Sequence, residues 1–109
     1  MIFMEIKEYN KLVRDNIPEI IEKDGEKPIT HIAEDEEYEK ALMEKLQEEV
    51  NEFLTEPSKK EMADVLEVLY AIAKLKGFDL DEVEKVRQER AEKRGGFNKR
   101  IILERTEKE

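Results

Sequence analysis

The sequence contains no cysteine, and this absence removes several classes of chemistry at once. Without thiols there are no disulfide bonds, no zinc sites built from thiolates and no cysteine nucleophile. Proline and glycine are also scarce, with three and four residues respectively among 109. We find no linker rich in these residues and no internal repeat, so residues 1–109 are expected to form a single domain.

Positive charge is outnumbered by negative charge. Twenty lysines and arginines face 29 acidic residues, which gives a formal net charge of -9. A nucleic acid duplex or an anionic membrane surface binds a cationic face, so neither is expected as a partner. No apolar run approaches the length of about 18 residues that spans a bilayer, and Met1–Met4 is too short for the apolar core of a signal peptide. We therefore expect a soluble, cytoplasmic protein.

A series of helix signals is present, separated by clear stops. Capping residues or a proline mark the starts, and glycines or a proline mark the ends. The predicted helices cover residues 17–23, 35–54, 59–76 and 80–94. Their capping side chains are expected from Asp15–Asn16, Ser58 and Asp79, the last two as capping boxes with Glu61 and Glu82.

Two short segments are richer in β-branched residues, Pro28–Ala33 and Arg100–Leu103. They are predicted to form a small two-stranded β element, and residues 1–8 are interpreted as either a short strand or a frayed arm. The predicted fold is therefore mainly α, an antiparallel bundle of about four helices with this β element. The helix at 59–76 is apolar on nearly all sides and needs to be surrounded, so we expect a homo-oligomer, either a dimer or a tetramer.

The most informative pattern is a set of five acidic residues on two successive predicted helices. They are Glu48, Glu49 and Glu52 on the first helix and Glu61 and Asp64 on the second. Residues three or four apart lie on one face of a helix, so Glu49 and Glu52 are neighbours, as are Glu61 and Asp64. A proline in the short connection ends the first helix and lets the two run antiparallel. We expect both pairs to point into one cleft.

Such a cleft is electrostatically unfavourable without a cation or shared protons. Two carboxylates about 4 Å apart repel by roughly 4 kcal/mol at an effective dielectric near 20. Since the chain has no cysteine and one histidine, the oxygen donors favour Mg²⁺, or Mn²⁺, over Zn²⁺. In a chain with 29 acidic residues, the alternative is that each pair belongs to an ordinary solvated helix face.

Two segments concentrate positive charge in this acidic chain. Lys11 and Arg14 lie one turn apart if their segment is helical. The second segment contains two cations and two glycines, which would let the backbone approach a phosphate chain. Its residues are Lys93, Arg94, Gly95, Gly96 and Phe97. The alternative for this second segment is that its cations and first glycine simply terminate a helix.

Together, these motifs resemble the all-α nucleotide pyrophosphohydrolase superfamily of MazG-like and phosphoribosyl-ATP pyrophosphatase-like proteins. The superfamily motif is E-E-x-x-E followed by E-x-x-D, which this chain has at Glu48–Glu52 and Glu61–Asp64. Three further segments resemble a small single-domain subgroup of house-cleaning pyrophosphatases. They are Tyr9–Asp15, Ile17–Ile21 and Arg94–Phe97. The resemblance covers about Tyr9 to Glu104.

The resemblance implies a Mg²⁺-dependent hydrolase with an oligomeric helical fold. It would split a nucleoside triphosphate between the α and β phosphates, giving a monophosphate and pyrophosphate. By position, the metal ligands would be Glu49, Glu52, Glu61 and Asp64, and Glu48 would lie behind them or orient the attacking water. Phosphate-facing residues would be Lys11, Arg14, Lys93, Arg94, Gly95, Gly96 and Phe97.

Two other functions stay open on the sequence alone. The first is a phosphoribosyl-ATP pyrophosphatase of histidine synthesis, which would use the same metal ligands on another substrate. The second is an acidic helical interaction module without catalysis, whose carboxylates bind divalent cations or keep the protein dissolved. The base of a nucleotide substrate also stays open. MazG-like enzymes usually carry an asparagine after the E-x-x-D motif, and this chain has none between Val65 and Lys76.

Overall fold

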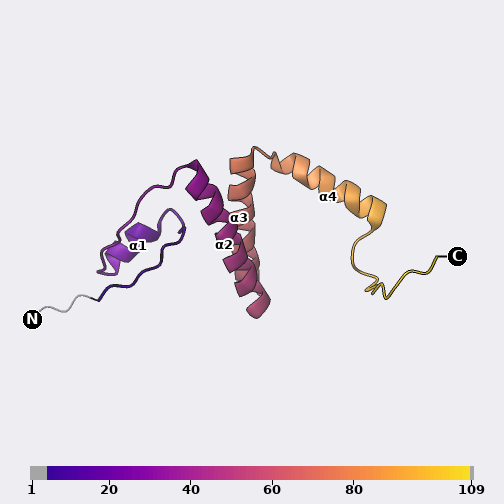
Figure 1. The fold of residues 1–109 in the computed structure, drawn as a ribbon, viewed down its shortest axis with the longest axis horizontal. Helices are drawn as coiled ribbons and strands as arrows, with labels where there is room; N and C mark the ends of the chain where they lie inside the picture. Colours follow the sequence, from indigo (N-terminus) through magenta and orange to yellow (C-terminus); the bar gives the residue numbers. More distant parts are fainter. Residues whose placement is uncertain (1–4, 109) are drawn as a thin grey trace, which may run out of the picture.

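Four α-helices and no β-strand make up residues 5–108, which are the residues that the computed structural model describes (Figure 1). The helices are α1 (Ile17–Lys23), α2 (Asp35–Thr55), α3 (Lys59–Lys76) and α4 (Leu80–Arg94). The prediction of four helices is confirmed, and each predicted boundary lies within one residue of the observed one. The predicted antiparallel bundle is wrong, because within residues 5–108 only α2 and α3 pack against each other.

Side-chain caps explain where α3 and α4 begin. The Ser58 hydroxyl accepts a hydrogen bond from the Glu61 amide at 3.1 Å, and Asp79 accepts one from the Asp81 amide at 2.8 Å. At α1 the predicted cap is wrong, because Asn16 already has helical backbone angles and its side chain makes no capping hydrogen bond. Proline in the first turn marks the start of α1 instead.

The α2 and α3 helices form an antiparallel hairpin across the three-residue connection 56–58. Their contact holds the buried apolar residues of the described chain, namely Leu42, Val68 and Ala73. An ion pair between Lys76 and Glu39 joins the end of α3 to the beginning of α2. The hairpin is therefore secured at its open end as well as at its turn.

The predicted β element is wrong, because neither segment forms a strand within residues 5–108. Ile29 and Ile32 are 83% and 93% exposed, and Ile101 and Ile102 are 78% and 83% exposed. A strand needs a neighbouring strand or an apolar layer to cover one face, and alternation in sequence supplies neither. Residues 5–8 are irregular, whereas residues 1–4 of the predicted strand or arm lie outside the described residues.

The described chain is elongated, with α1 and α4 on opposite sides of the hairpin (Figure 1). Its radius of gyration is 20.1 Å and its extents are 79 × 30 × 26 Å, whereas a compact domain of this length has a radius of gyration of about 13 Å. Among residues 5–108, only α2 and α3 share more than a marginal contact. No helix of the described residues combines the length and the apolarity required to cross a bilayer.

Candidate metal centre

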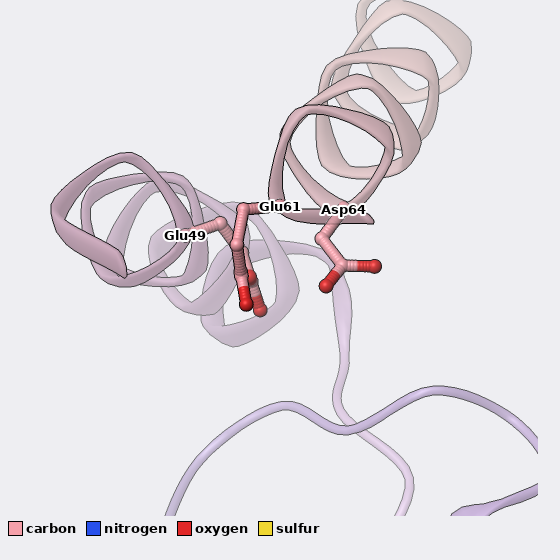
Figure 2. A group of neighbouring side chains, drawn as sticks. All are labelled: Glu49, Glu61 and Asp64. Atoms are coloured by element: carbon pink, nitrogen blue, oxygen red, sulfur yellow. The ribbon is translucent and has the colours of Figure 1, made fainter. Parts of the chain in front are cut away.

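Three carboxylates converge near the turn of the α2–α3 hairpin. Glu49 comes from α2, and Glu61 and Asp64 come from the first two turns of α3 (Figure 2). One oxygen from each lies within 4.8 Å of the others. The Ser58 cap fixes where α3 begins, so it also fixes the direction in which Glu61 and Asp64 project. We call these three residues the carboxylate cluster.

Two oxygens of the carboxylate cluster are buried without a hydrogen-bond partner. They are Glu49 Oε2 and Glu61 Oε2. Glu49 is only 8% exposed, the one buried charged residue among those described. Its pKa is raised, first because burial disfavours the charged form and then because Glu52 and Asp64 are negative neighbours. An ionised Glu49 therefore weakens the fold unless a positive group joins it.

Three basic side chains, Lys45, Lys11 and Arg14, border the carboxylate cluster, and a fourth, the exposed Lys60, lies 3.8 Å from Glu61 Oε1. Lys45 Nζ lies 3.3 Å from Glu48 Oε2 and 3.4 Å from Glu49 Oε1. Lys11 Nζ lies 2.9 Å from Glu48 Oε1. These hydrogen bonds, that of Lys11 most of all, lower the pKa of Glu48, and the same pairing raises the pKa of Lys11. Glu48 is thus held ionised beside the carboxylate cluster.

The third basic side chain is Arg14, whose Nη2 donates to Asp64 Oδ1 at 2.9 Å. Lys11 and Arg14 both belong to the irregular segment before α1, yet they reach residues 37 and 50 positions later in the chain. The structure therefore brings together the N-terminal basic segment and both acidic motifs.

Sequence reasoning missed Lys45, which is the most buried cation at this site, with a side chain 16% exposed. It precedes Glu48 by three residues and Glu49 by four, the spacing at which side chains meet on a helix. The sequence signal that could have revealed Lys45 is this spacing to Glu48 and Glu49. Lys45 neutralises part of the negative charge, but it leaves Glu49 Oε2 without a partner.

Glu52 lies beside the carboxylate cluster and is exposed to solvent. It lines an open depression with residues from the end of α2 and with Glu61 of α3. Three residues along a helix correspond to a rotation of about 300°, so Glu52 is turned roughly 60° away from Glu49. Glu49 therefore faces α3, whereas Glu52 lies at the solvent-exposed edge of the carboxylate cluster.

The glycine-containing basic segment lies apart from the carboxylate cluster within one chain. The turn at Gly77 directs α4 away from the hairpin, and Gly95 then ends α4 with a positive φ of 83° (Figure 1). Asp64 and the start of α4 are separated by 16 residues, most of them helical, or on the order of 20 Å at 1.5 Å per residue. Phe97 is 96% exposed.

The cluster of Glu49, Glu61 and Asp64 could hold a metal ion. Its donors are all carboxylate oxygens, which are the ligands preferred by hard cations such as Mg²⁺, Mn²⁺ and Ca²⁺. Comparisons with protein-family models, with curated proteins and with solved structures find no match to this chain. A function therefore has to be argued from the residues of this site.

Proposed function

We propose that the protein is a Mg²⁺-dependent nucleoside triphosphate pyrophosphohydrolase, with Mn²⁺ as a substitute metal, as the resemblance of its motifs implies. One observation carries this proposal: two buried carboxylate oxygens, Glu49 Oε2 and Glu61 Oε2, have no partner at a point where three carboxylates meet. Unpaired acidic oxygens at such a point are costly unless a cation joins them.

The donor set fits a hard dication. At a separation of 4.8 Å, two ionised carboxylates repel by roughly 3 kcal/mol at an effective dielectric near 20. Lys45 offsets only part of this repulsion, because both of its contacts are to oxygens other than the two unpartnered ones. Glu49, Glu61 and Asp64 would hold the ion, and Glu52 would join them from the rim.

A hard dication supplies charge neutralisation and Lewis acidity toward phosphate oxygens. The residues of the chain orient the reactants. Glu48 accepts a hydrogen bond from the attacking water and takes the proton that the water releases. The water oxygen forms a bond to the α phosphorus, and the bond from that phosphorus to the bridging oxygen breaks. Pyrophosphate leaves with the bonding electron pair, and the nucleoside monophosphate remains.

The basic side chains supply the counter-charge for the substrate. Lys11 and Arg14 stand at the rim of the carboxylate cluster, where a triphosphate on the ion would meet them. Arginine in particular binds phosphate through parallel N–H donors, and such charge-assisted bonds are strong.

The proposal includes a homodimer or homotetramer. Apolar side chains of α3 and α4 are exposed in a single chain, with Leu66 at 42%, Val83 at 46% and Val86 at 52%. A second copy that covers them would also offer its Lys93–Phe97 segment to a site that the same segment of one chain does not reach. Val86→Asp should then convert the oligomer to monomers, as measured by light scattering. Wild-type protein that is monomeric at high concentration would contradict this part of the proposal.

The test of the activity is to incubate the protein with Mg²⁺ and a panel of normal and damaged nucleoside and deoxynucleoside triphosphates, with phosphoribosyl-ATP included. Pyrophosphate and monophosphate should appear in equal amounts from at least one of them. Glu49→Gln should reduce the rate at least about a hundredfold, because it removes an ionised oxygen donor. Glu44→Gln, an exposed position on the same helix, is the matched control and should keep the rate. Release of pyrophosphate from none of the substrates would refute the proposal.

A further inference from the structure

The segment Asn10–Asp15 contacts the hairpin through side-chain ion pairs rather than through backbone hydrogen bonds. The two ion pairs are Lys11 with Glu48 and Arg14 with Asp64, each at 2.9 Å. No backbone hydrogen bond joins this segment to α2 or α3 in the described part of the chain. Leu12 is the one residue of 5–16 that is not exposed. We call Asn10–Asp15 the cationic strap.

The cationic strap is weakly held by its ion pairs, and a backbone turn at Asn10 sets the direction in which it runs. The Lys11 side chain is 44% exposed and that of Arg14 is 56% exposed, so water competes for both pairs. Asn10 has a positive φ of 48°, a left-handed conformation that asparagine tolerates and that turns the chain just before Lys11. The segment can therefore leave the hairpin without breaking a packed core.

Both pairs occupy groups that the proposed reaction needs free. Arg14 holds Oδ1 of Asp64, one of the three residues of the carboxylate cluster. Lys11 Nζ donates to Oε1 of Glu48 at 2.9 Å and so occupies the carboxylate that the proposed reaction uses to orient the attacking water. A dication at the cluster would be repelled by the guanidinium and would compete with it for Asp64.

The geometry also leaves the strap able to bind an anion. The structure gives Arg14 a single ion pair, through Nη2, and a guanidinium has five N–H donors. A polyphosphate offers several oxygens to the N–H donors of this guanidinium, and it adds negative charge where the dication adds positive charge. A dication at the carboxylate cluster and a polyphosphate beside it would together favour the transfer of Lys11 and Arg14 from carboxylates to phosphates.

We propose that the cationic strap opposes the divalent cation, Arg14 by competing with it for Asp64 and Lys11 by adding positive charge while it holds Glu48, and that a bound polyphosphate relieves this opposition by drawing Lys11 and Arg14 onto itself. This inference rests on the proposed function. It predicts that the ion binds weakly alone and more tightly with a triphosphate, so the site is assembled when substrate arrives. Glu48 loses its ion pair with Lys11 in the same event and becomes free to orient the attacking water.

The test is calorimetric titration of Mn²⁺ into the full chain without nucleotide. Arg14→Met should tighten Mn²⁺ binding about threefold to tenfold, because the competing guanidinium is gone. Lys60→Met is the matched control: Lys60 lies 3.8 Å from Glu61 but is 83% exposed and outside the strap, so its loss should change Mn²⁺ binding less than about twofold. Lys11→Met is a second variant, expected to act in the same direction as Arg14→Met.

The same variants are then titrated with a non-hydrolysable triphosphate at saturating Mn²⁺. Here Arg14→Met should weaken binding about tenfold or more, opposite in sign to its effect on the metal alone. Mn²⁺ affinity that is unchanged or weaker in both Arg14→Met and Lys11→Met would overturn the competition, while the proposed function would stand. Absence of Mn²⁺ binding in every variant would instead refute the metal centre itself.

Discussion

The α2–α3 hairpin and α4 differ in what surrounds them, although both follow from equally clear sequence signals. All three helices end at a glycine or next to a proline, and α3 and α4 begin with a side-chain cap. Yet the hairpin contains the buried residues and the carboxylate cluster, whereas α4 has no buried residue. Local signals therefore determine that a helix forms, and only a packing partner determines what its side chains can do.

The largest expected effect separates the core of the hairpin from the segment after α4. Leu42 is 2% exposed, so Leu42→Ala should lower the free energy of unfolding by about 2–5 kcal/mol through lost burial and a cavity. Leu103→Ala is the same change at a side chain 76% exposed and should stay within about 0.5 kcal/mol. Chemical denaturation measures both. Equal losses would mean that the two regions do not differ as described.

The next effect concerns the charge buried in the hairpin. The pKa of Glu49 is raised in the folded protein, so the folded state holds this proton more tightly than the unfolded state. Ionisation of Glu49 therefore removes stability as the pH rises above its ordinary value near 4.5. Without metal, Glu49→Gln should raise the free energy of unfolding at pH 7, because the amide carries no charge that burial and the negative neighbours Glu52 and Asp64 would penalise.

The pH dependence provides the check on that prediction. Below about pH 4, where a carboxyl is protonated even when unfolded, the advantage of Glu49→Gln should disappear. Glu48 has a lowered pKa, so its contribution has the opposite sign and is lost as the pH falls. A Glu49→Gln variant that is less stable than wild type at pH 7 without metal would contradict the burial argument.

The smallest effect compares two predicted caps. Ser58→Ala removes the hydroxyl that accepts from the Glu61 amide, and it should cost about 1 kcal/mol. Asn16→Ala removes a side chain that makes no capping hydrogen bond and should cost much less. Thermal unfolding of the two variants distinguishes them. A larger loss of stability for Asn16→Ala than for Ser58→Ala would mean that the Asn16 side chain caps α1, as the sequence predicted.

Much of the helical structure could be predicted from the sequence because its causes are local. Capping side chains, prolines and glycines act within a few residues, which is why the bounds of α3 match the prediction. The β element failed because strand formation depends on a partner, and neither of the two segments has one in the described chain. The elongated shape was not foreseen, since nothing local indicates whether α4 packs on its own hairpin.

The candidate site, like the helices, could be predicted from the sequence only where its causes are local. Spacing along a helix placed Glu61 and Asp64 on one face, and the short connection placed Glu49 opposite them. The ion pair of Arg14 with Asp64 spans 50 residues, and no local rule selects that partner. Lys45 could have been found from its spacing to Glu49, but spacing along a helix does not indicate that its side chain is only 16% exposed.

The measurement that most directly tests the metal centre is the melting temperature as a function of Mg²⁺ at constant ionic strength. Wild-type protein should melt several degrees higher at saturating Mg²⁺, since binding to the folded state at about 100 times Kd adds roughly 2.7 kcal/mol. Glu61→Gln should lose this rise, whereas Glu67→Gln, an exposed position on the same helix, should keep it. An equal rise in wild type and Glu61→Gln, or no rise in wild type, would contradict the account.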